Sequence, residues 1–255
     1  MARFDLSEVE WALIAPLLPN KPRGVARTDD RRVLNAIFYI LRTGSPWRDL
    51  PERYGPYTTA YNRYNRWAKA GVWLRIFEAL AASSPQSMQL IDASIVRAHQ
   101  HAAGGKKGGP DHAIGRSRGG LTSKIHAVVD ERGLPVRLAL SAGQASDKAS
   151  APMLLAGLPT VSVVVADRGY DWQHLIDLVT ERGGQAHIPT QRDRKVQRSV
   201  DRAIYRQRNL VERFFCKLKH FRRIATRYDK LARNVLAAVA LASARIWIRT
   251  YESTT

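Results

Sequence analysis

Two aspartates stand directly after apolar segments of the sequence. Asp92 follows Met88–Ile91, and Asp167 follows the largely β-branched run 161–166. Such runs predict buried strands, and a carboxylate at the end of a buried strand is costly unless it has a partner. Divalent cations such as Mg²⁺ and Mn²⁺ prefer carboxylate oxygens. An acid in this position can instead form a turn, and Asp167 keeps that alternative open because Gly169 follows it closely.

A third acid, Glu212, lies in a predicted helix over residues 203–222. At roughly 100° per residue, Tyr205, Arg208, Glu212 and Lys219 fall within about 60° of one another and form one stripe. The adjoining arc is apolar, so the helix is expected to pack by that face and to bring Glu212 to the edge of a sheet. A chance salt-bridge stripe from Arg208 to Glu212 is the alternative. That alternative does not explain why Tyr205 and Lys219 share the line.

The spacing of this stripe resembles the Y-R-E-K motif of bacterial DDE transposases in the insertion-sequence 4/5 superfamily, insertion-sequence 5 group. The resemblance extends over nearly the whole chain. Residues 44–51 resemble the family's N-terminal module, residues 115–126 its basic loop and second strand, and residues 166–171 the segment with the second acid. Many relatives have lysine where Arg168 stands, and this difference keeps the charge.

The resemblance implies an RNase H-like core, with Asp92 on the first strand, Asp167 just after the fourth and Glu212 on the helix after the fifth. It also implies a transposase that binds the terminal inverted repeats of its insertion sequence, cleaves at the ends and joins the 3'-hydroxyls to target DNA. Arg208 and Lys219 are then expected to contact DNA phosphate, and Tyr205 a nucleotide near the end of the element. Two ends must be synapsed, so at least a homodimer is implied.

The three acids, Asp92, Asp167 and Glu212, are therefore expected to be the catalytic residues and the metal ligands. Two Mg²⁺ ions, or Mn²⁺ in their place, can clamp one phosphodiester when they lie about 4 Å apart. One ion activates the attacking water or 3'-hydroxyl, and the other stabilises the leaving oxygen. Such a reaction needs no covalent intermediate.

The composition favours a polyanionic partner. Lys and Arg number 41 against 22 Asp and Glu, which gives a net charge of +19 and a pI near 10.7. Residues 191–255 hold 17 of the basic residues and only 5 of the acidic ones. A basic surface made only for solubility is the alternative, but acids serve solubility better. We expect double-stranded DNA as the partner.

No membrane segment or disulfide framework is expected. The longest apolar stretch, 235–244, is about half of a membrane span, and acids replace the apolar run of a signal peptide at the N-terminus. A cytoplasmic protein, associated with the nucleoid when bound to DNA, is predicted. The single cysteine, Cys216, is expected to be a buried thiol. Three histidines could ligate a metal, but their glycine-rich setting favours a mobile loop: His99, His101 and His112.

Two domains are expected, with a boundary near residue 85. Residues 1–85 predict an all-α, helix-turn-helix-like DNA-binding domain, and residues 86–255 a mixed five-stranded sheet flanked by helices. The N-terminal helices are expected at 8–18, from 28 or 29 to 43, at 61–70 and at 73–82. The C-terminal order is strands 88–97, 122–130 and 135–141, helix 148–157, strand 161–166, helix 172–182, strand 186–189, and helices 203–222 and 231–250.

Two basic regions are candidates for DNA contact. Arg63, Arg66 and Lys69 recur at spacing three and predict an exposed stripe on the third helix, although a solvated charged face explains them equally well. The glycine-rich segment 99–120 is expected to be a long loop that orders along a phosphate backbone, with a disordered loop as the alternative. The basic candidates in and after this loop are Arg116, Arg118 and Lys124.

Two other functions fit parts of the pattern. A DNA-binding protein that descends from such an enzyme would need only the basic C-terminal region and the N-terminal helices. An RNase H-like nuclease or resolvase would cut DNA without joining it. The three acids disfavour the first alternative, and the sequence does not separate the second from a transposase.

Overall fold

The computed structural model describes residues 3–19, 27–85, 87–103, 112–159 and 163–252. The chain divides into two compact units. The helical unit consists of residues 1–81, 98–112 and 218–255, and the sheet unit of residues 82–97 and 113–217. The division at 81/82 is close to the expected boundary near 85. The C-terminal segment differs from the expectation, because it groups with the N-terminal helices and not with the sheet.

The four helices expected at the N-terminus are all present in the helical unit, and their ends follow the sequence signals. Ser7 and Glu10 form the predicted capping box, and Asp29 caps the second helix. That second helix ends at Gly44, whose φ of 76° suits glycine. The helices are α1 (Glu8–Ile14), α2 (Asp30–Thr43), α3 (Tyr57–Lys69), α4 (Val72–Ala81), α9 (Arg222–Ala225) and α10 (Ala232–Glu252).

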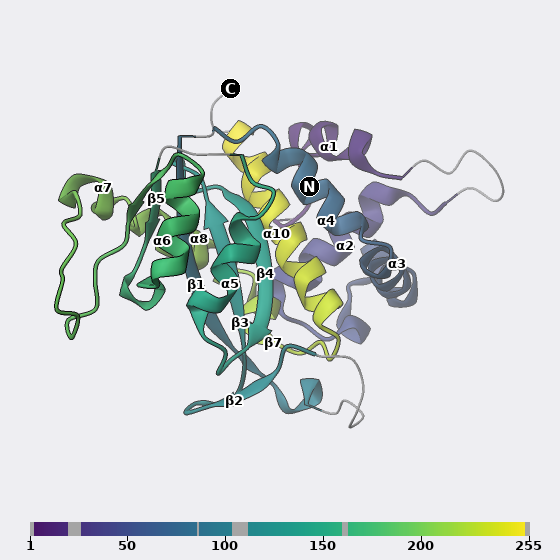
Figure 1. The fold of residues 1–255 in the computed structure, drawn as a ribbon. Helices are drawn as coiled ribbons and strands as arrows, with labels where there is room; N and C mark the ends of the chain where they lie inside the picture. The colour runs from purple at the N-terminus through teal and green to yellow at the C-terminus, as the bar shows by residue number, and fades with distance from the viewer. Residues whose placement is uncertain (1–2, 20–26, 86, 104–111, 160–162, 253–255) are drawn as a thin grey trace. The chain divides into compact units, whose positions relative to one another are not determined.

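Helix α10 organises the helical unit and packs against α4, α1 and α3 (Figure 1). Its first two-thirds is the apolar stretch of the sequence, and most of those side chains are fully buried. Three polar contacts fix its neighbours. The Trp73 indole donates to Tyr64 O over 3.1 Å, the Tyr64 hydroxyl donates to Asn234 O, and Arg245 of α10 pairs with Glu10 of α1 over 2.8 Å.

The sheet unit contains the five predicted strands and one short additional strand. The order is β4-β3-β1-β5-β6, in which β4, β3 and β1 are antiparallel neighbours and β1, β5 and β6 are parallel. The short strand β2 pairs with the start of β3. The bounds are β1 (Met88–Ala98), β2 (Gly115–Ser117), β3 (Gly120–Val129), β4 (Pro135–Ala142), β5 (Val163–Ala166) and β6 (Gln185–His187).

The segment 99–120 is therefore not one unstructured loop. It contains a 3-10 turn, η4 (Gln100–Ala102), and strand β2, whose Gly115 pairs with Thr122. The glycines allow this hairpin, because Gly120 has a φ of 93° at the β2–β3 turn. The residues between 104 and 111 lie outside the described residues.

Helices α5 (Asp147–Leu155) and α6 (Gln173–Glu181) lie together in front of the sheet (Figure 1). They bury the apolar residues of one sheet face, among them Ile91 and Val164, together with Leu154 and Leu175 of the helices. Successive side chains of a strand point to opposite faces. The side chain that follows Ile91 in β1 is therefore directed away from α5 and α6.

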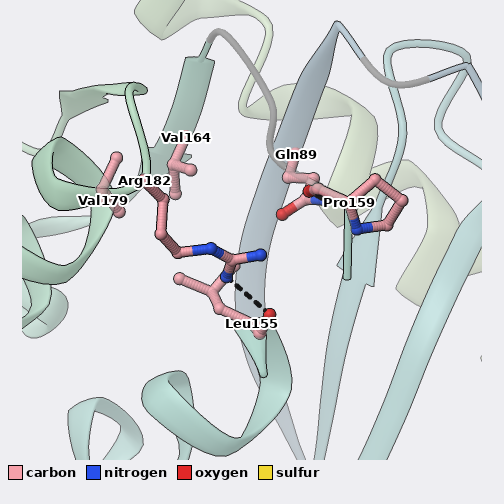
Figure 2. Close-up of a pocket in the computed structure, with 6 residues that line it drawn as sticks. All are labelled: Gln89, Leu155, Pro159, Val164, Val179 and Arg182. Carbon is pink, nitrogen blue, oxygen red and sulfur yellow. Dashed lines mark hydrogen bonds between the residues drawn. The ribbon is translucent and has the colours of Figure 1, made fainter. Parts of the chain in front are cut away.

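A small pocket opens where α5 and α6 meet the beginnings of β1 and β5 (Figure 2). Arg182 closes it by donating to Leu155 O over 2.7 Å. Gln89 and Val164 mark its position at the N-terminal ends of the two parallel strands. A volume of about 10 Å³ leaves it too small for a substrate.

The helix predicted over 203–222 is divided. It consists of α7 (Arg202–Arg206) and α8 (Asn209–Lys219), and α9 begins only at Arg222. Between α7 and α8 the backbone tightens, because Leu210 N donates to Gln207 O and Val211 N to Arg208 O. These are i to i+3 bonds, as in a 3-10 turn. The expectation of one continuous helix over 203–222 was thus wrong.

Among the helices in the described ranges, none combines the length and the apolarity that crossing a bilayer requires.

Candidate active site

The parallel pairing of β1 and β5 brings the two aspartates together. Leu90 pairs with Val165 and Ile91 with Ala166. Asp92 and Asp167 are the next residue of each strand, and neighbouring strands lie only about 4.8 Å apart. The electrostatic contact of the two groups agrees, since the charge of Asp167 raises the pKa of Asp92. The sequence prediction that each acid follows an apolar strand segment agrees with this register, although β1 continues past Asp92 to Ala98.

Arg208 joins Glu212 to this pair of acids. Its guanidinium donates to Asp92 Oδ2 over 3.1 Å and also to Glu212 Oε1. The side chains of Arg208 and Asp92 are 24% and 19% exposed, so one positive charge lies partly buried between two carboxylates. The division of the helix does not separate these residues, because Arg208 and Glu212 remain four positions apart across the turn.

Asp92 has a perturbed acidity. The pKa of its carboxyl is raised from 3.8 to about 6, mainly by burial and in addition by the charges of Asp167 and Glu212. The Ala93 amide, which donates to Asp92 Oδ1 over 2.7 Å, and the Arg208 guanidinium act in the opposite direction. Crowded and partly buried carboxylates of this kind are a frequent mark of functional sites.

Asp167 also shapes its own turn. Its side chain accepts from Gly169 N over 2.7 Å and caps the 3-10 turn η5 (Arg168–Tyr170). A Cβ at Gly169 would lie 2.9 Å from Asp167 Oδ1, so a larger residue there would require the Asp167 carboxylate to shift. The turn-forming alternative is thus confirmed as a local role, and one carboxylate oxygen of Asp167 takes no part in that hydrogen bond.

Tyr170 is a neighbour that the sequence did not single out. Its hydroxyl is buried, and no partner for it occurs among the described residues. Burial raises the pKa of Tyr170 well above its usual value, and the charges of Asp92, Asp147 and Asp167 add to the shift. An unsatisfied hydroxyl beside several carboxylates fits a site that a hydrated cation completes.

The donor set therefore has the chemistry of a divalent-metal site, although the arrangement is open. No three acidic, histidine or cysteine side chains converge on one point in the part of the chain that the structure describes. The Arg208 guanidinium holds the position of a cation between Asp92 and Glu212. The same finding applies to His99, His101 and the described His112, which form no such group.

For the remaining residues of the predicted stripe, no hydrogen bond or ion pair to this cluster occurs among the described residues. Tyr205 is half-buried in α7, and its only described effect on the cluster is electrostatic, through Arg208. Lys219 is exposed at the end of α8 and belongs to the helical unit. Cys216 is exposed and not buried as expected, because it faces away from the side of α8 that buries Val211 and Phe214.

Two of the basic candidates for DNA contact are engaged inside the fold. Arg63 was expected on an exposed stripe, but it is 5% exposed, pairs with Asp30 and stacks on Trp67. Lys124 donates to Ala145 O over 2.7 Å and pairs with Asp147 over 2.9 Å. The other four candidates are exposed: Arg66, Lys69, Arg116 and Arg118.

Asp171 is a further carboxylate, four residues after Asp167. It does not cap the helix α6 that follows it, because the residue at the cap position is Trp172. The Asp171 side chain is instead fully buried, accepts from Gln191 N over 2.9 Å and pairs with Arg194 and Arg198. These contacts span 20 to 27 residues of the chain, so no local spacing in the sequence indicates them.

Comparison with known proteins gives a consistent result. The family described as "Transposase DDE domain" matches residues 83–247, and the family described as "Putative transposase of IS4/5 family" matches residues 6–77. A Brucella ovis protein named "Putative transposase for insertion sequence element IS6501" is 39% identical over 130 residues, which are 51% of this chain and all of that protein.

Two further relatives cover smaller parts. The Sinorhizobium fredii protein y4sN, named as uncharacterized, is 41% identical over 40% of this chain and 83% of its own length. A Burkholderia cepacia protein, "Insertion element IS402 uncharacterized 16.2 kDa protein", is 37% identical over 38% of this chain and 76% of its own length.

Two solved structures also resemble the chain at low identity. A piggyBac transposase synaptic complex with hairpin DNA is 9% identical, covers 96% of this chain and 72% of its own, and has a TM-score of 0.48. The Mos1 transposase paired-end complex with the left transposon end is 10% identical, covers 88% and 82%, and has a TM-score of 0.26.

Proposed function

The chain belongs to the family of DDE transposases, enzymes that cleave and transfer DNA strands, and on this premise we propose its activity and its residues. It binds the terminal inverted repeats of its insertion sequence, cleaves phosphodiester bonds at the ends and joins the 3'-hydroxyls to target DNA. Asp92, Asp167 and Glu212 are the catalytic residues.

One observation carries this proposal. Asp92 and Asp167 directly follow the last paired residues of two neighbouring parallel strands, and Arg208 links Glu212 to Asp92. Three acids that lie far apart in the sequence are thus linked, two by strand pairing and the third through Arg208. The raised pKa of Asp92 supports the same grouping, since both other acids contribute to it.

We propose that the three carboxylates hold two Mg²⁺ ions, with Mn²⁺ as a substitute. When bound, such ions activate the attacking oxygen and stabilise the leaving oxygen. The chain's own residues supply the ligands and their positions. Asp92 is fixed by the Ala93 amide and Asp167 by the Gly169 amide, so each aspartate keeps an oxygen outside these bonds.

Three residues of the Y-R-E-K motif besides Glu212 are proposed to hold the DNA. Arg208 and Lys219 contact phosphates beside the cut, because guanidinium and ammonium groups bind phosphate well. Tyr205 contacts a nucleotide near the end of the element. The half-buried position of Tyr205, beside Arg208, supports that role.

The helical unit is proposed to read the terminal repeat through α3 in a helix-turn-helix-like manner. Arg66 and Lys69 remain on its exposed side, whereas the buried Arg63 is no longer a candidate. At the β2–β3 turn, Arg116 and Arg118 are proposed to contact the phosphate backbone. Lys124 is left out because its ammonium is paired with Asp147.

The sheet unit is proposed to be an RNase H-like core. Three antiparallel strands followed by two parallel ones, with an acid on the first strand and another after the fourth expected strand, support this assignment. We also propose a homodimer or a higher multimer on DNA, since two ends of the element must be held together for transfer.

The test is an Mg²⁺-dependent assay with a pre-cut element end and a target plasmid. We expect joined product from the wild type and none after chelation with EDTA. Asp92→Asn, Asp167→Asn and Glu212→Gln should each lose cleavage and joining while they keep binding to the terminal repeat. Asp193→Asn is the matched control, because Asp193 is an exposed acid of the same unit.

The outcomes separate the alternatives. Cutting without joining would indicate a nuclease, and DNA binding without either reaction would indicate a non-catalytic binder. Full activity in one of the three variants would remove that residue from the catalytic set.

A further inference from the structure

The Arg208 guanidinium lies where a cation between Asp92 and Glu212 would have to lie. It donates to Asp92 Oδ2 over 3.1 Å and to Glu212 Oε1. We propose that Arg208 is a latch, which holds these two carboxylates in the DNA-free protein and opposes the entry of divalent cations until DNA phosphate draws it away. This inference rests on the proposed function, since it assumes that the carboxylates bind metal.

The latch and a metal ion compete for the same site. Asp92 Oδ2 and Glu212 Oε1 both accept from Arg208, and carboxylate oxygens are also the ligands that a divalent cation prefers. A guanidinium also carries a permanent positive charge, which repels a nearby divalent cation, more strongly so when the pair is partly buried. With Arg208 in this position, no three ligands converge among the described residues.

The local backbone gives Arg208 this position. It lies in the short turn between α7 and α8, where Arg208 N donates to Tyr205 O over 3.0 Å and Val211 N donates to Arg208 O over 3.2 Å. Across this turn Arg208 keeps the four-residue spacing to Glu212 and its ion pair with it. From the same position its side chain also reaches Asp92 of β1.

DNA phosphate is the chemistry that would release the latch. A phosphate offers a guanidinium two parallel hydrogen bonds and a full negative charge. When Arg208 moves to a phosphate, the two carboxylates lose their shared cation and gain affinity for a divalent one. Metal loading is then coupled to DNA binding, and each ligand raises the affinity for the other by the same factor.

The coupling has a consequence for the free protein. Without DNA, Arg208 holds the acids together and little metal binds. The enzyme is therefore loaded with metal only after it has bound DNA. A purely structural ion pair between Arg208 and Glu212 predicts no such competition. The affinity of the DNA-free protein for metal therefore distinguishes the two interpretations.

The experiment is a titration of the DNA-free protein with Mn²⁺, followed by the loss of the free-ion signal in electron paramagnetic resonance. Arg208→Ala should bind Mn²⁺ about tenfold more tightly than the wild type, as expected when one nearby charge and its two ion pairs are removed. Arg208→Lys should lie between the two, because an ammonium keeps the charge but lacks the fork that spans both carboxylates.

Arg206→Ala is the matched control. Arg206 is exposed, and its described hydrogen bond goes to Arg202 O of its own helix. This variant loses the same charge two residues away without touching either carboxylate. Its Mn²⁺ affinity should equal that of the wild type.

A second arm adds a duplex oligonucleotide. Because the duplex itself binds Mn²⁺, the signal is taken as the difference between the protein with Asp92 intact and its Asp92→Asn variant. The amount of Mn²⁺ bound through Asp92 should be small for the wild type without DNA. When the duplex is present, it should rise toward the amount bound by Arg208→Ala.

The results separate the latch from the proposed function. The latch is refuted if Arg208→Ala binds Mn²⁺ no more tightly than the wild type, or if Arg206→Ala shows the same gain in Mn²⁺ affinity. In either case, Mn²⁺ binding by the DNA-free wild type would leave the proposed function intact. If neither the wild type nor Arg208→Ala takes up Mn²⁺ with or without DNA, although circular dichroism shows both to be folded, the metal site itself is refuted.

Discussion

Asp92 and Asp167 each come directly after the last residue of the pairing between β1 and β5, at Ile91 and Ala166. The two carboxylates are therefore neighbours by construction of the sheet and do not depend on a loop for their proximity. The two carboxylates repel each other, and the charge of Asp167 contributes to the raised pKa of Asp92. A site of this kind is preorganised for a cation and unfavourable without one.

The first prediction concerns the pH dependence of stability without metal. Burial raises the pKa of Asp92 from 3.8 to about 6, so the folded protein binds more protons than the unfolded chain at intermediate pH. This contribution to stability is fully present below 3.8 and is lost as the pH rises through about 6. Asp92→Asn, which resembles the protonated acid, should escape the loss.

The measurement is the melting temperature in EDTA. At pH 5 the wild type and Asp92→Asn should melt close together. At pH 8 the variant should melt a few degrees higher, as expected for a difference on the order of 1 kcal/mol. A difference that does not change with pH would contradict the assignment of the shift to Asp92.

Much of the fold follows from local patterns in the sequence. The capping box at Ser7, the glycine that ends α2 and the β-branched run that forms β5 are short-range signals, and each gave the right element. The order of strands and helices around Asp92 and Asp167 follows from the same signals. Asp167 could therefore be assigned to the end of a strand before its proximity to Asp92 was known, whereas Asp92 lies within β1.

The remaining features depend on contacts between distant parts of the chain. No proline or glycine indicates that the helix divides at Arg208. The Arg208 side chain at this division donates a hydrogen bond to Asp92, which is 116 residues away in the sequence. The burial of Arg63 depends on Asp30, 33 residues away. That α10 groups with the N-terminal helices depends on packing across the whole chain. Periodicity carries no information on such partners.

The second prediction concerns the buried pair of Glu10 and Arg245 in the helical unit. Both side chains are 3% exposed, and the guanidinium also donates to Asp5 O. Glu10→Gln leaves a buried guanidinium without its counter-ion, which costs about 3–5 kcal/mol of stability. Glu8→Gln is the control, because Glu8 is 83% exposed in its pair with Arg31 and such pairs contribute at most about 1 kcal/mol.

Urea unfolding followed by tryptophan fluorescence measures this difference. Five of the six tryptophans belong to the helical unit, so the signal reports on the unit that contains the pair. Similar midpoints for Glu10→Gln and Glu8→Gln would show that the buried pair does not stabilise the unit.

The third prediction concerns the segment that follows β6. Asp171 is fully buried and receives hydrogen bonds from Gln191 N, Arg194 and Arg198. Asp171→Asn keeps the shape of the side chain but loses its charge, and charge-assisted bonds are about twice as strong as neutral ones. The segment should then open more often and be cut several-fold faster by trypsin between residues 192 and 198.

Mass spectrometry of the early fragments checks the position of the cuts. Asp193→Asn lies in the same segment and removes an exposed acid, so it should leave the rate of cleavage unchanged. Equal rates for Asp171→Asn and the wild type would mean that Asp171 does not anchor the segment.

The last prediction concerns acid sensitivity and rests on His126 in β3. The ring is buried, shares a hydrogen bond between Nε2 and Ser141 Oγ over 2.7 Å, and has no partner for Nδ1 among the described residues. Burial lowers the pKa of His126, Asp147 opposes the shift, and Lys124 adds to it. The folded state therefore favours the neutral ring.

The sign of this effect is opposite to that of Asp92. Below pH 6.5 the unfolded chain takes up a proton that the folded protein resists, so this stability is present above pH 6.5 and is lost as the pH falls toward the lowered folded value. His126→Gln cannot be protonated and should lose less stability than the wild type between pH 7 and pH 5. His174→Gln, an exposed histidine of the same unit, should behave as the wild type, and a steeper acid loss in His126→Gln would refute the assignment.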